Sequence, residues 1–346
     1  MKLNELSITE ASKGLTEKRF SSVELTKACL FRIHERAGLN AFISVFEDEA
    51  LKEAEEADKR IAQGEKESLT GIPFSVKDAI CTADRRSTGA AKILDNYLPF
   101  FDATVIRNIR EQGAVLLGKN NCDSFGHGAS NENSMYGPVK NPFDESRVSG
   151  GSSGGSAVAV ADHMAIFSIG EDTGGSIRQP ASFCGIFGLR PSYGRNSRFG
   201  IMPMASSFDT VGPLGKSAED IAILMNVMAG KDPKDAGTVP DPVPDYVSAL
   251  KKTQEKLRIG IPKEYFELEG MDPETRSIVE VRIAEFEKQG LILVPLSLPY
   301  TSYAIPVYYV LVPSEDSSNL ARLDGMRYGV RKEQKDLYDT YTHSRS

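Results

Sequence analysis

Apolar strands alternate with helices along the chain, and this order constrains the fold more than any other feature of the sequence. Residues 70–76 and 114–118 are apolar or β-branched, and a helix ending at a glycine is expected between them over 103–112. The same order recurs late in the chain, over residues 257–261, 272–290 and 291–294. Strands joined through helices by short connections form largely parallel sheets. The sequence therefore predicts an α/β fold in which helices cover a mixed, largely parallel sheet.

Helix signals dominate the first 66 residues. Ser21-Ser22-Val23-Glu24 has the form of a capping box and precedes a helix that extends to about Arg36. A second helix is expected from Glu47 to Gln63. We expect one domain over 1–346, made of the following segments: a helical N-terminal segment (1–66), a catalytic core (67–230), a Pro- and Asp-rich surface connection (231–245), and a βαβ and remaining segment (246–346).

Composition excludes several classes of protein. The chain has 346 residues, of which 40% are hydrophobic and 26% charged, as in soluble globular proteins. Its net charge of -7 argues against a broad basic surface for nucleic acid. The four scattered cysteines form no CxxC pair, so neither a metal site nor a disulfide framework is expected. No secretory signal and no membrane-length apolar run are visible, and we expect a cytoplasmic protein without membrane contact.

Residues 149–156 form a tract of glycine and serine, SGGSSGGS. Such tracts are often flexible linkers, but the apolar run 157–161 follows at once, so this tract enters packed structure. A phosphate-binding loop of the GxxxxGK[ST] type is not met, because no lysine follows the glycines. What remains is a turn whose backbone needs glycine and which holds the hydroxyls of Ser152 and Ser153.

A second glycine pair stands in Asp172-Thr173-Gly174-Gly175-Ser176-Ile177-Arg178. Consecutive glycines before a serine let several backbone N–H groups converge on one point, as an oxyanion hole requires. The candidate donors are the N–H groups of Thr173, Gly174, Gly175 and Ser176. A tight turn with an incidental serine is the alternative.

Lys77 ends the first apolar strand. An isolated lysine in that position usually extends to solvent. A nucleophilic serine needs a base, however, and none of the four histidines (His34, His127, His163 and His343) lies in a recognisable nucleophile motif. A lysine can replace histidine as the base where burial leaves it neutral.

Together these segments resemble the amidase signature family. Its hallmark is a long Gly/Ser-rich stretch, here GGSSGGSAVAVADHMAIFSIGEDTGGSIRQPASFCG over 150–185. The family places its bridging serine and its nucleophile 24 positions apart, as Ser152 and Ser176 are in this sequence. The resemblance implies the amidase signature fold, with Ser176 as nucleophile, Ser152 as relay and Lys77 as base. It also implies a cis peptide bond between Gly151 and Ser152.

Within that family the chain is similar to the A subunits of tRNA-dependent amidotransferases. The matching stretches are 69–80, 88–121, 130–142, 187–213 and, most diagnostic, YYVLVPSEDSSNLARLDGMRYG at 308–329. This resemblance implies a glutaminase that forms an acyl-enzyme and supplies ammonia to a glutamine-dependent carbon–nitrogen ligase. It implies a B subunit that binds ATP, Mg²⁺ and the mischarged tRNA, a small C subunit, and no cofactor or metal in this chain. Glu-tRNA(Gln) and Asp-tRNA(Asn) both stay open as substrates.

Two departures from the resembling subunits bear on activity. Glu171 stands where they usually carry serine or threonine, and we expect its carboxylate to alter the electrostatics of the site. Those subunits also continue well past the position of Ser346, into the region that binds the α-groups of glutamine, so the fold is expected to be C-terminally incomplete.

The remaining candidate substrate contacts are Ser130, Tyr308 and Tyr309. We therefore expect the chain as it stands to hydrolyse glutamine poorly or not at all. Two other functions stay open: a free-standing amidase of small amides, and an inactive scaffold subunit.

Overall fold

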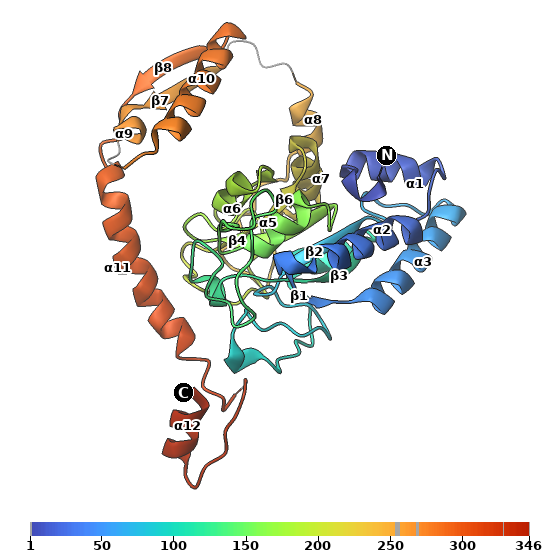
Figure 1. The fold of residues 1–346 in the computed structure, drawn as a ribbon, viewed down its shortest axis with the longest axis vertical. Coiled ribbons are helices and arrows are strands. Elements are labelled where there is room, and N and C mark those ends of the chain that lie inside the picture. The colour runs from blue at the N-terminus through green and yellow to red at the C-terminus, as the bar shows by residue number, and fades with distance from the viewer. Residues whose placement is uncertain (1, 253–256, 268–269, 328, 346) are drawn as a thin grey trace. The chain divides into compact units, whose positions relative to one another are not determined.

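The computed structural model describes residues 2–252, 257–267, 270–327 and 329–345, which group into two compact units (Figure 1). The first unit comprises Met1–Val247 and Ser314–Ser346, and the second comprises Ser248–Pro313. The predicted connection 231–245 falls in the first unit, just before this division. One amidase signature domain over 1–346 stays a prediction.

A six-stranded sheet forms the centre of the first unit. In spatial order its strands are β1 (Phe42–Val45), β3 (Val115–Asn120), β2 (Pro73–Lys77), β4 (Phe167–Asp172), β6 (Thr210–Gly215) and β5 (Phe187–Gly188). β2 pairs in parallel with β3 and β4, whereas the pairs β1–β3, β4–β6 and β5–β6 are antiparallel. The α/β class and the mixed sheet are thus confirmed, but "largely parallel" is wrong for this sheet. Parallel pairing requires a long crossover, and here crossovers through helices serve only the central strands.

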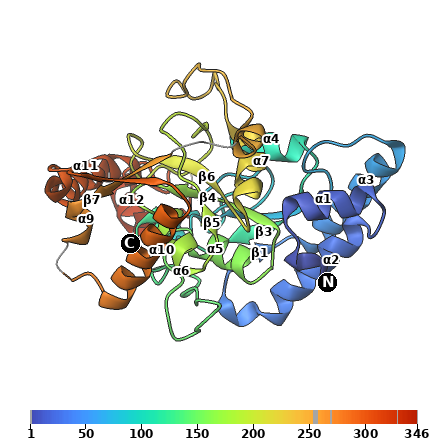
Figure 2. The same ribbon diagram turned by 90° about the horizontal axis from the view of Figure 1, so that it is seen from above.

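Helices cover both faces of this sheet. The chain passes from β2 through α4 (Thr104–Glu111) to β3 on one side, then returns through α5 (Gly154–Ala161) to β4 on the other side. Right-handed crossovers in opposite directions place their helices on opposite faces, as Figure 2 shows for α4 and α5. α7 (Ala218–Met228) packs against β6 and α4. The carboxyl ends of β2 and β4 consequently open at the same edge.

The N-terminal helices follow the sequence signals closely. The Ser21 hydroxyl accepts a hydrogen bond from Glu24 N–H at 3.0 Å, and the Glu24 carboxylate accepts one from Ser21 N–H at 2.8 Å. The predicted capping box is therefore confirmed. The helices of this region are α1 (Ile8–Thr16), α2 (Ser22–Glu35) and α3 (Glu47–Gln63). This unit also contains α6 (Arg178–Phe183), α12 (Leu337–Arg345) and the 3₁₀ turns Leu3–Glu5, Ala37–Leu39, Lys92–Leu94 and Ser124–Gly126.

The core beneath the central strands is tightly packed. Phe74 of β2 lies opposite Phe167 of β4, and their rings stack with centroids 5.2 Å apart. Both side chains are fully buried, and burying such a ring contributes about 1.5–3 kcal/mol to folding. Lys77 lies three residues beyond Phe74 on the same strand, so this core fixes the backbone that carries it.

The second unit contains the predicted strand–helix–strand. β7 (Arg258–Pro262) and β8 (Ile292–Leu296) pair in parallel, and α10 (Pro273–Lys288) connects them after the short α9 (Lys263–Phe266). The Asp272 carboxylate accepts Thr275 N–H at 2.7 Å, so Asp272 is the N-cap of α10, directly before Pro273. α8 (Tyr246–Leu250) and α11 (Thr301–Leu320) each cross a boundary between the units. Over the described residues, no helix combines the length and apolar character needed to span a membrane.

Candidate active site

Lys77 lies at the carboxyl end of β2, between β3 and β4. Its side chain is fully buried. The Nζ atom donates a hydrogen bond to Ser152 Oγ at 2.7 Å. A buried charged group is costly unless it is paired or hydrogen-bonded, so the surroundings of Nζ decide what this lysine can do. Lys77 therefore does not extend to solvent, as an isolated lysine at the end of a strand usually does.

Ser152 lies in the Gly/Ser turn that leads into α5 and is 1% exposed. Gly150 adopts φ +77°, which favours glycine, and Gly151 N–H donates to Gln179 Oε1 at 2.9 Å. A Cβ on Gly151 would lie 2.1 Å from Asp123 Oδ2, so only glycine fits. The Gly151–Ser152 peptide bond is cis, as the resemblance implies. The tract is thus a packed turn rather than a linker.

Ser176 lies in the loop between β4 and α6 and is 8% exposed. A backbone hydrogen bond connects this loop to the Gly/Ser turn, since Ser153 N–H donates to the Ser176 carbonyl at 3.1 Å. This hydrogen bond places the residue next to Ser152 against Ser176. The structure therefore brings the turn, the loop and the end of β2 together, while the catalytic roles of the three residues stay predictions.

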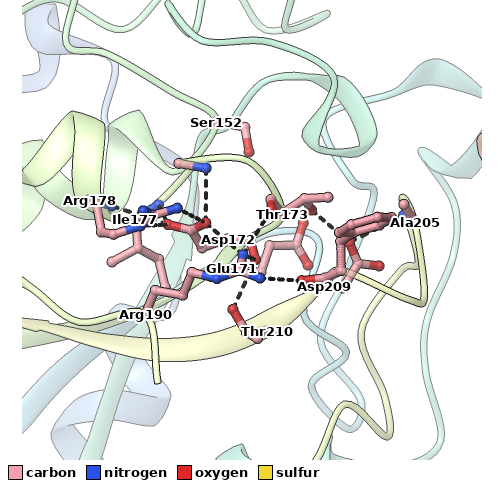
Figure 3. A network of polar contacts seen from close by, with 12 residues as sticks. Ser152, Glu171, Asp172, Thr173, Ile177, Arg178, Arg190, Ala205, Asp209 and Thr210 are labelled. Atoms are coloured by element: carbon pink, nitrogen blue, oxygen red, sulfur yellow. Dashed lines mark hydrogen bonds and ion pairs between the residues drawn. The ribbon is translucent and has the colours of Figure 1, made fainter. Parts of the chain in front are cut away.

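Asp172 organises the loop that carries Ser176 (Figure 3). Its carboxylate accepts Gly175 N–H at 2.9 Å and Ile177 N–H at 3.1 Å. The guanidinium groups of Arg178 and Arg190 lie within 3.1 and 2.9 Å of the same carboxylate. Burial alone would raise the pKa of Asp172, but hydrogen bonds from Arg178, Ile177 N–H and Arg190 outweigh it and hold that pKa below its usual value. Asp172 is therefore a charged anchor of the loop.

The anchor changes the predicted oxyanion hole. Since Gly175 N–H is already donated to Asp172, this amide is engaged inside the loop. Thr173, Gly174 and Ser176 are not among the donors to Asp172, and their N–H groups stay the predicted oxyanion donors. The physical reason is that Asp172, at the end of β4, carries a carboxylate. This carboxylate competes with an oxyanion for hydrogen bonds from the nearest backbone amides.

Arg190 and Asp209 are two site residues that the sequence reasoning missed. Arg190 Nη1 donates to the carbonyls of Asp172 at 2.6 Å and Thr173 at 2.8 Å, and Nη2 donates to the carbonyl of Phe208 at 2.8 Å. The Thr173 hydroxyl donates to Asp209 Oδ1 at 2.6 Å. Burial raises the pKa of Asp209. Arg190 falls within the matching stretch 187–213, but no local motif marked it or Asp209 as belonging to the site.

Glu171 contacts the predicted base directly. Its Oε1 lies 3.1 Å from Lys77 Nζ, and both side chains are buried. Burial raises the pKa of the Glu171 carboxyl, against the opposing effect of Lys77. Asp78, which follows Lys77 in the sequence, instead accepts hydrogen bonds from the N–H and the hydroxyl of Thr88 at 2.8 and 2.5 Å. The expectation that Glu171 lies close enough to act on the site is confirmed.

The predicted substrate contacts fall in different regions of the chain. Ser130 is half-buried, and its N atom lies 3.0 Å from the point where a Cβ of Gly151 would stand, so it borders the catalytic turn. Tyr308 and Tyr309 belong to the second unit, where their rings pack edge to face with centroids 5.4 Å apart. Substrate contact by any of the three stays a prediction.

Metal-binding clusters are absent from the described regions of the chain, where no group of three or more His, Cys, Asp or Glu side chains is arranged to hold an ion. The four cysteines are buried free thiols. The candidate catalytic groups at this site are serine hydroxyls, a lysine amine and carboxylates.

Known proteins match both the sequence and the fold. The Amidase family profile matches residues 24–346, and the chain belongs to the amidase family. The A subunit of the glutamyl-tRNA(Gln) amidotransferase of Desulfatibacillum aliphaticivorans is 48% identical over 347 positions, covering 100% of this chain and 72% of that protein. Its counterpart of the same name in Coxiella burnetii (strain RSA 493 / Nine Mile phase I) is 49% identical over 346 positions, covering 99% of this chain and 71% of that protein.

Solved structures give the same result. The A subunit of the glutamyl-tRNA(Gln) amidotransferase of Thermotoga maritima matches with a TM-score of 0.83 and 37% identity, covering 92% of this chain and 67% of that one. The native peptide amidase of Stenotrophomonas maltophilia matches with a TM-score of 0.83 and 33% identity, covering 93% of this chain and 68% of that one.

Proposed function

We propose that this chain hydrolyses glutamine as the amidase subunit of a glutamyl-tRNA(Gln) amidotransferase. The observation that carries the proposal is the 2.7 Å contact between Lys77 Nζ and Ser152 Oγ, buried beside the Ser176 loop. Relatives that share 48–49% of its residues bear the name of that subunit. A hydroxyl paired with an amine base is the arrangement by which a serine nucleophile is activated.

In the proposed reaction, Ser176 Oγ attacks the side-chain amide carbon of glutamine. As the C–O bond forms, the Ser176 proton passes to Ser152 Oγ and the Ser152 proton passes to Lys77 Nζ. The amide oxygen takes up the negative charge, which backbone N–H groups of Thr173, Gly174 and Ser176 stabilise. Loss of one such donor typically costs about 2.7–4 kcal/mol of transition-state stabilisation.

The tetrahedral intermediate then collapses. The relay returns a proton to the amide nitrogen, the C–N bond breaks, and ammonia leaves. A γ-glutamyl ester remains on Ser176. Water attacks this ester through the same relay and releases glutamate, which restores the free serine.

The ammonia would be used by a partner. A B subunit binds ATP and Mg²⁺, activates the glutamate or aspartate carried by mischarged tRNA, and receives the ammonia, while a small C subunit joins the assembly. This chain then holds no cofactor of its own and contacts tRNA only through the B subunit. The amidotransferase name of its relatives supports this assignment.

A second candidate is a free-standing amidase. The peptide amidase of Stenotrophomonas maltophilia, with a TM-score of 0.83, favours it, but its 33% identity is lower than that of the amidotransferase subunits. The two functions differ in the amide that is hydrolysed.

Ammonia release from glutamine, acetamide, benzamide and a C-terminal peptide amide separates these functions. The assay uses the chain with its co-expressed B and C subunits, and Ser176→Ala as the negative control. We expect turnover of glutamine above the simple amides, abolished in Ser176→Ala. Turnover of simple amides without glutamine would establish the free-standing amidase, and assembly with no turnover of any amide would establish a scaffold.

A further inference from the structure

A carboxylate lies against the base of the proposed relay. Glu171 is the residue before Asp172 on β4, and its Oε1 lies 3.1 Å from Lys77 Nζ. Both carboxylate oxygens are buried and neither makes a hydrogen bond with a described residue, so the contact between Oε1 and Nζ is an ion pair. Lys77 Nζ thus contacts both Ser152 Oγ and Glu171 Oε1.

The charges around Glu171 come from several elements. Lys77 is its ion-pair partner among the described residues. Asp209 raises the pKa of Glu171 and His127 lowers it, both at longer range than the lysine. Other titratable side chains facing this region are Asp78, Cys81, Cys122 and Asp123. Asp172, although adjacent in sequence, is held by Arg178 and Arg190.

This arrangement poses a problem for a two-step relay. Lys77 Nζ donates to Ser152 Oγ and pairs with a carboxylate, which is how an ammonium group behaves. An ammonium has no lone pair, so it cannot accept the Ser152 proton until it has given one away. Within reach of Nζ, Glu171 Oε1 is the carboxylate oxygen that can take it.

We propose that Glu171 is the terminal proton acceptor of the relay, acting through Lys77; this inference rests on the proposed function of the same site. As Ser176 attacks, its proton moves to Ser152, the Ser152 proton moves to Lys77, and one Lys77 proton moves to Glu171. The negative charge of the carboxylate is thereby replaced by that of the oxyanion. When the C–N bond breaks, the three transfers reverse and deliver a proton to the leaving nitrogen.

The surroundings of Glu171 suit this task. Burial disfavours its charged form and raises its pKa, which makes the carboxylate a better proton acceptor. Gly126, at φ +79°, leaves the space beside Oε1 open, since a Cβ there would lie 3.3 Å from Oε1 and 3.6 Å from Ser152 Oγ. Glu171 does not touch the reacting atoms, so it is a positioning residue for the proton on Lys77.

The pair makes a specific prediction for pH dependence. Lys77 and Glu171 hold one proton between them in the active state, and a second proton stops the relay. That second proton can leave from either group, so the pair loses it at a lower pH than a lone lysine beside a neutral amide would. Glu171→Gln therefore moves the acid limb of the rate to higher pH. We expect a shift that is resolved in the pH profile, because the variant keeps only one of the two groups that can release this proton.

The test measures the rate at which a diazoketone analogue of glutamine labels the protein, as a function of pH. Glu171→Gln and Glu171→Ser both remove the carboxylate, and both are expected to shift the acid limb upward. Glu171→Asp, which restores a carboxylate, is expected to move it back toward the wild type. Glu145→Gln, at an exposed glutamate on the surface, is the matched control and leaves the profile unchanged.

Two results overturn the inference: a limb that stays in place in both carboxylate-free variants, or labelling that is faster than wild type at every pH. The second would mean that Glu171 inhibits by holding Lys77 charged. Labelling that persists in Ser176→Ala would instead refute the proposed function itself. Thermal unfolding of each variant identifies any that fails to fold, and Glu171→Ser then carries the test if Glu171→Gln is lost.

Discussion

The carboxylate of Asp172 and the guanidinium of Arg190 meet at 2.9 Å at the base of the loop that carries Ser176. Asp172 is fully buried, and it ends β4 where that strand pairs with Thr210 of β6. The same guanidinium donates to two carbonyls of the loop. One ion pair thus joins the strand, the loop and the segment that leads to β6.

Removing the carboxylate of Asp172 is expected to destabilise the fold. Asp172→Ala leaves three backbone amides and two guanidinium groups without this acceptor, and breaking a buried pair in this way costs about 3–5 kcal/mol. Chemical denaturation measures the free energy of unfolding. Asp144→Ala, at an exposed aspartate that pairs locally with Arg147, is the control and is expected to change it little. Equal effects of the two substitutions would contradict the anchoring role.

The same residue gives a pH-dependent prediction. The pKa of Asp172 is lowered in the folded state, so its contribution is fully present above the unfolded carboxyl value of about 3.9 and is lost as pH falls through the lower folded value. The difference in unfolding free energy between wild type and Asp172→Asn should therefore shrink in strong acid. A difference that grows as pH falls would show that the carboxylate is protonated in the native state.

Replacing Arg190 by lysine is expected to damage the rate more than the fold. Lysine keeps the charge but lacks the planar fork that contacts Asp172, Thr173 and Phe208 at once. A loop displaced by about 1 Å can lower a rate by about 10²-fold. We expect the labelling rate at Ser176 to fall by this order while the unfolding midpoint moves slightly. An unchanged labelling rate would show that Arg190 does not hold the loop in its position.

A buried lysine far from the site provides an independent check on the packing. Lys216 donates to the carbonyls of Asn4 and Leu6 at 2.7 and 3.0 Å, and burial lowers its pKa to about 8. Its unfolded value is about 10.4, so between these values the unfolded chain binds more protons and the contribution of Lys216 to stability rises with pH.

The free energy of unfolding of wild type minus that of Lys216→Met should thus increase from pH 8 upward. Subtracting the variant removes the opposing effect of the buried thiols, whose raised pKa values lower stability at alkaline pH. Lys27→Met, at an exposed lysine, is expected to give a flat difference. A flat difference for Lys216→Met as well would place its ammonium in solvent.

Local features were predictable from the sequence, whereas contacts between residues far apart in the sequence were not. The capping box at Ser21, the N-cap at Asp272 and the packed Gly/Ser turn are each encoded within a few neighbouring residues. The parallel centre of the sheet also followed from helix-sized connections. The antiparallel pairs at both edges of the sheet were missed, in part because the outermost strands, β1 with four residues and β5 with two, are too short for a periodic pattern.

The site shows the same division. Lys77 and Ser152 are separated by 75 positions, and no periodicity connects them, so their contact was accessible only through the resemblance to a family. Arg190 contacts Asp172, which is 18 positions away in the sequence, and no sequence motif indicates this contact. The loss of Gly175 as an oxyanion donor depends on the rotamer of Asp172, which a sequence pattern does not specify.

The identity of the nucleophile is the part of the proposed mechanism that one measurement can decide. The chain, with its partner subunits, is treated with the diazoketone analogue of glutamine, and peptide mass spectrometry locates the adduct. We expect a single adduct on Ser176, absent in Ser176→Ala and in Lys77→Arg, because arginine stays protonated and cannot relay a proton. An adduct on Ser152 or Ser153, or full labelling of Lys77→Arg, would contradict it.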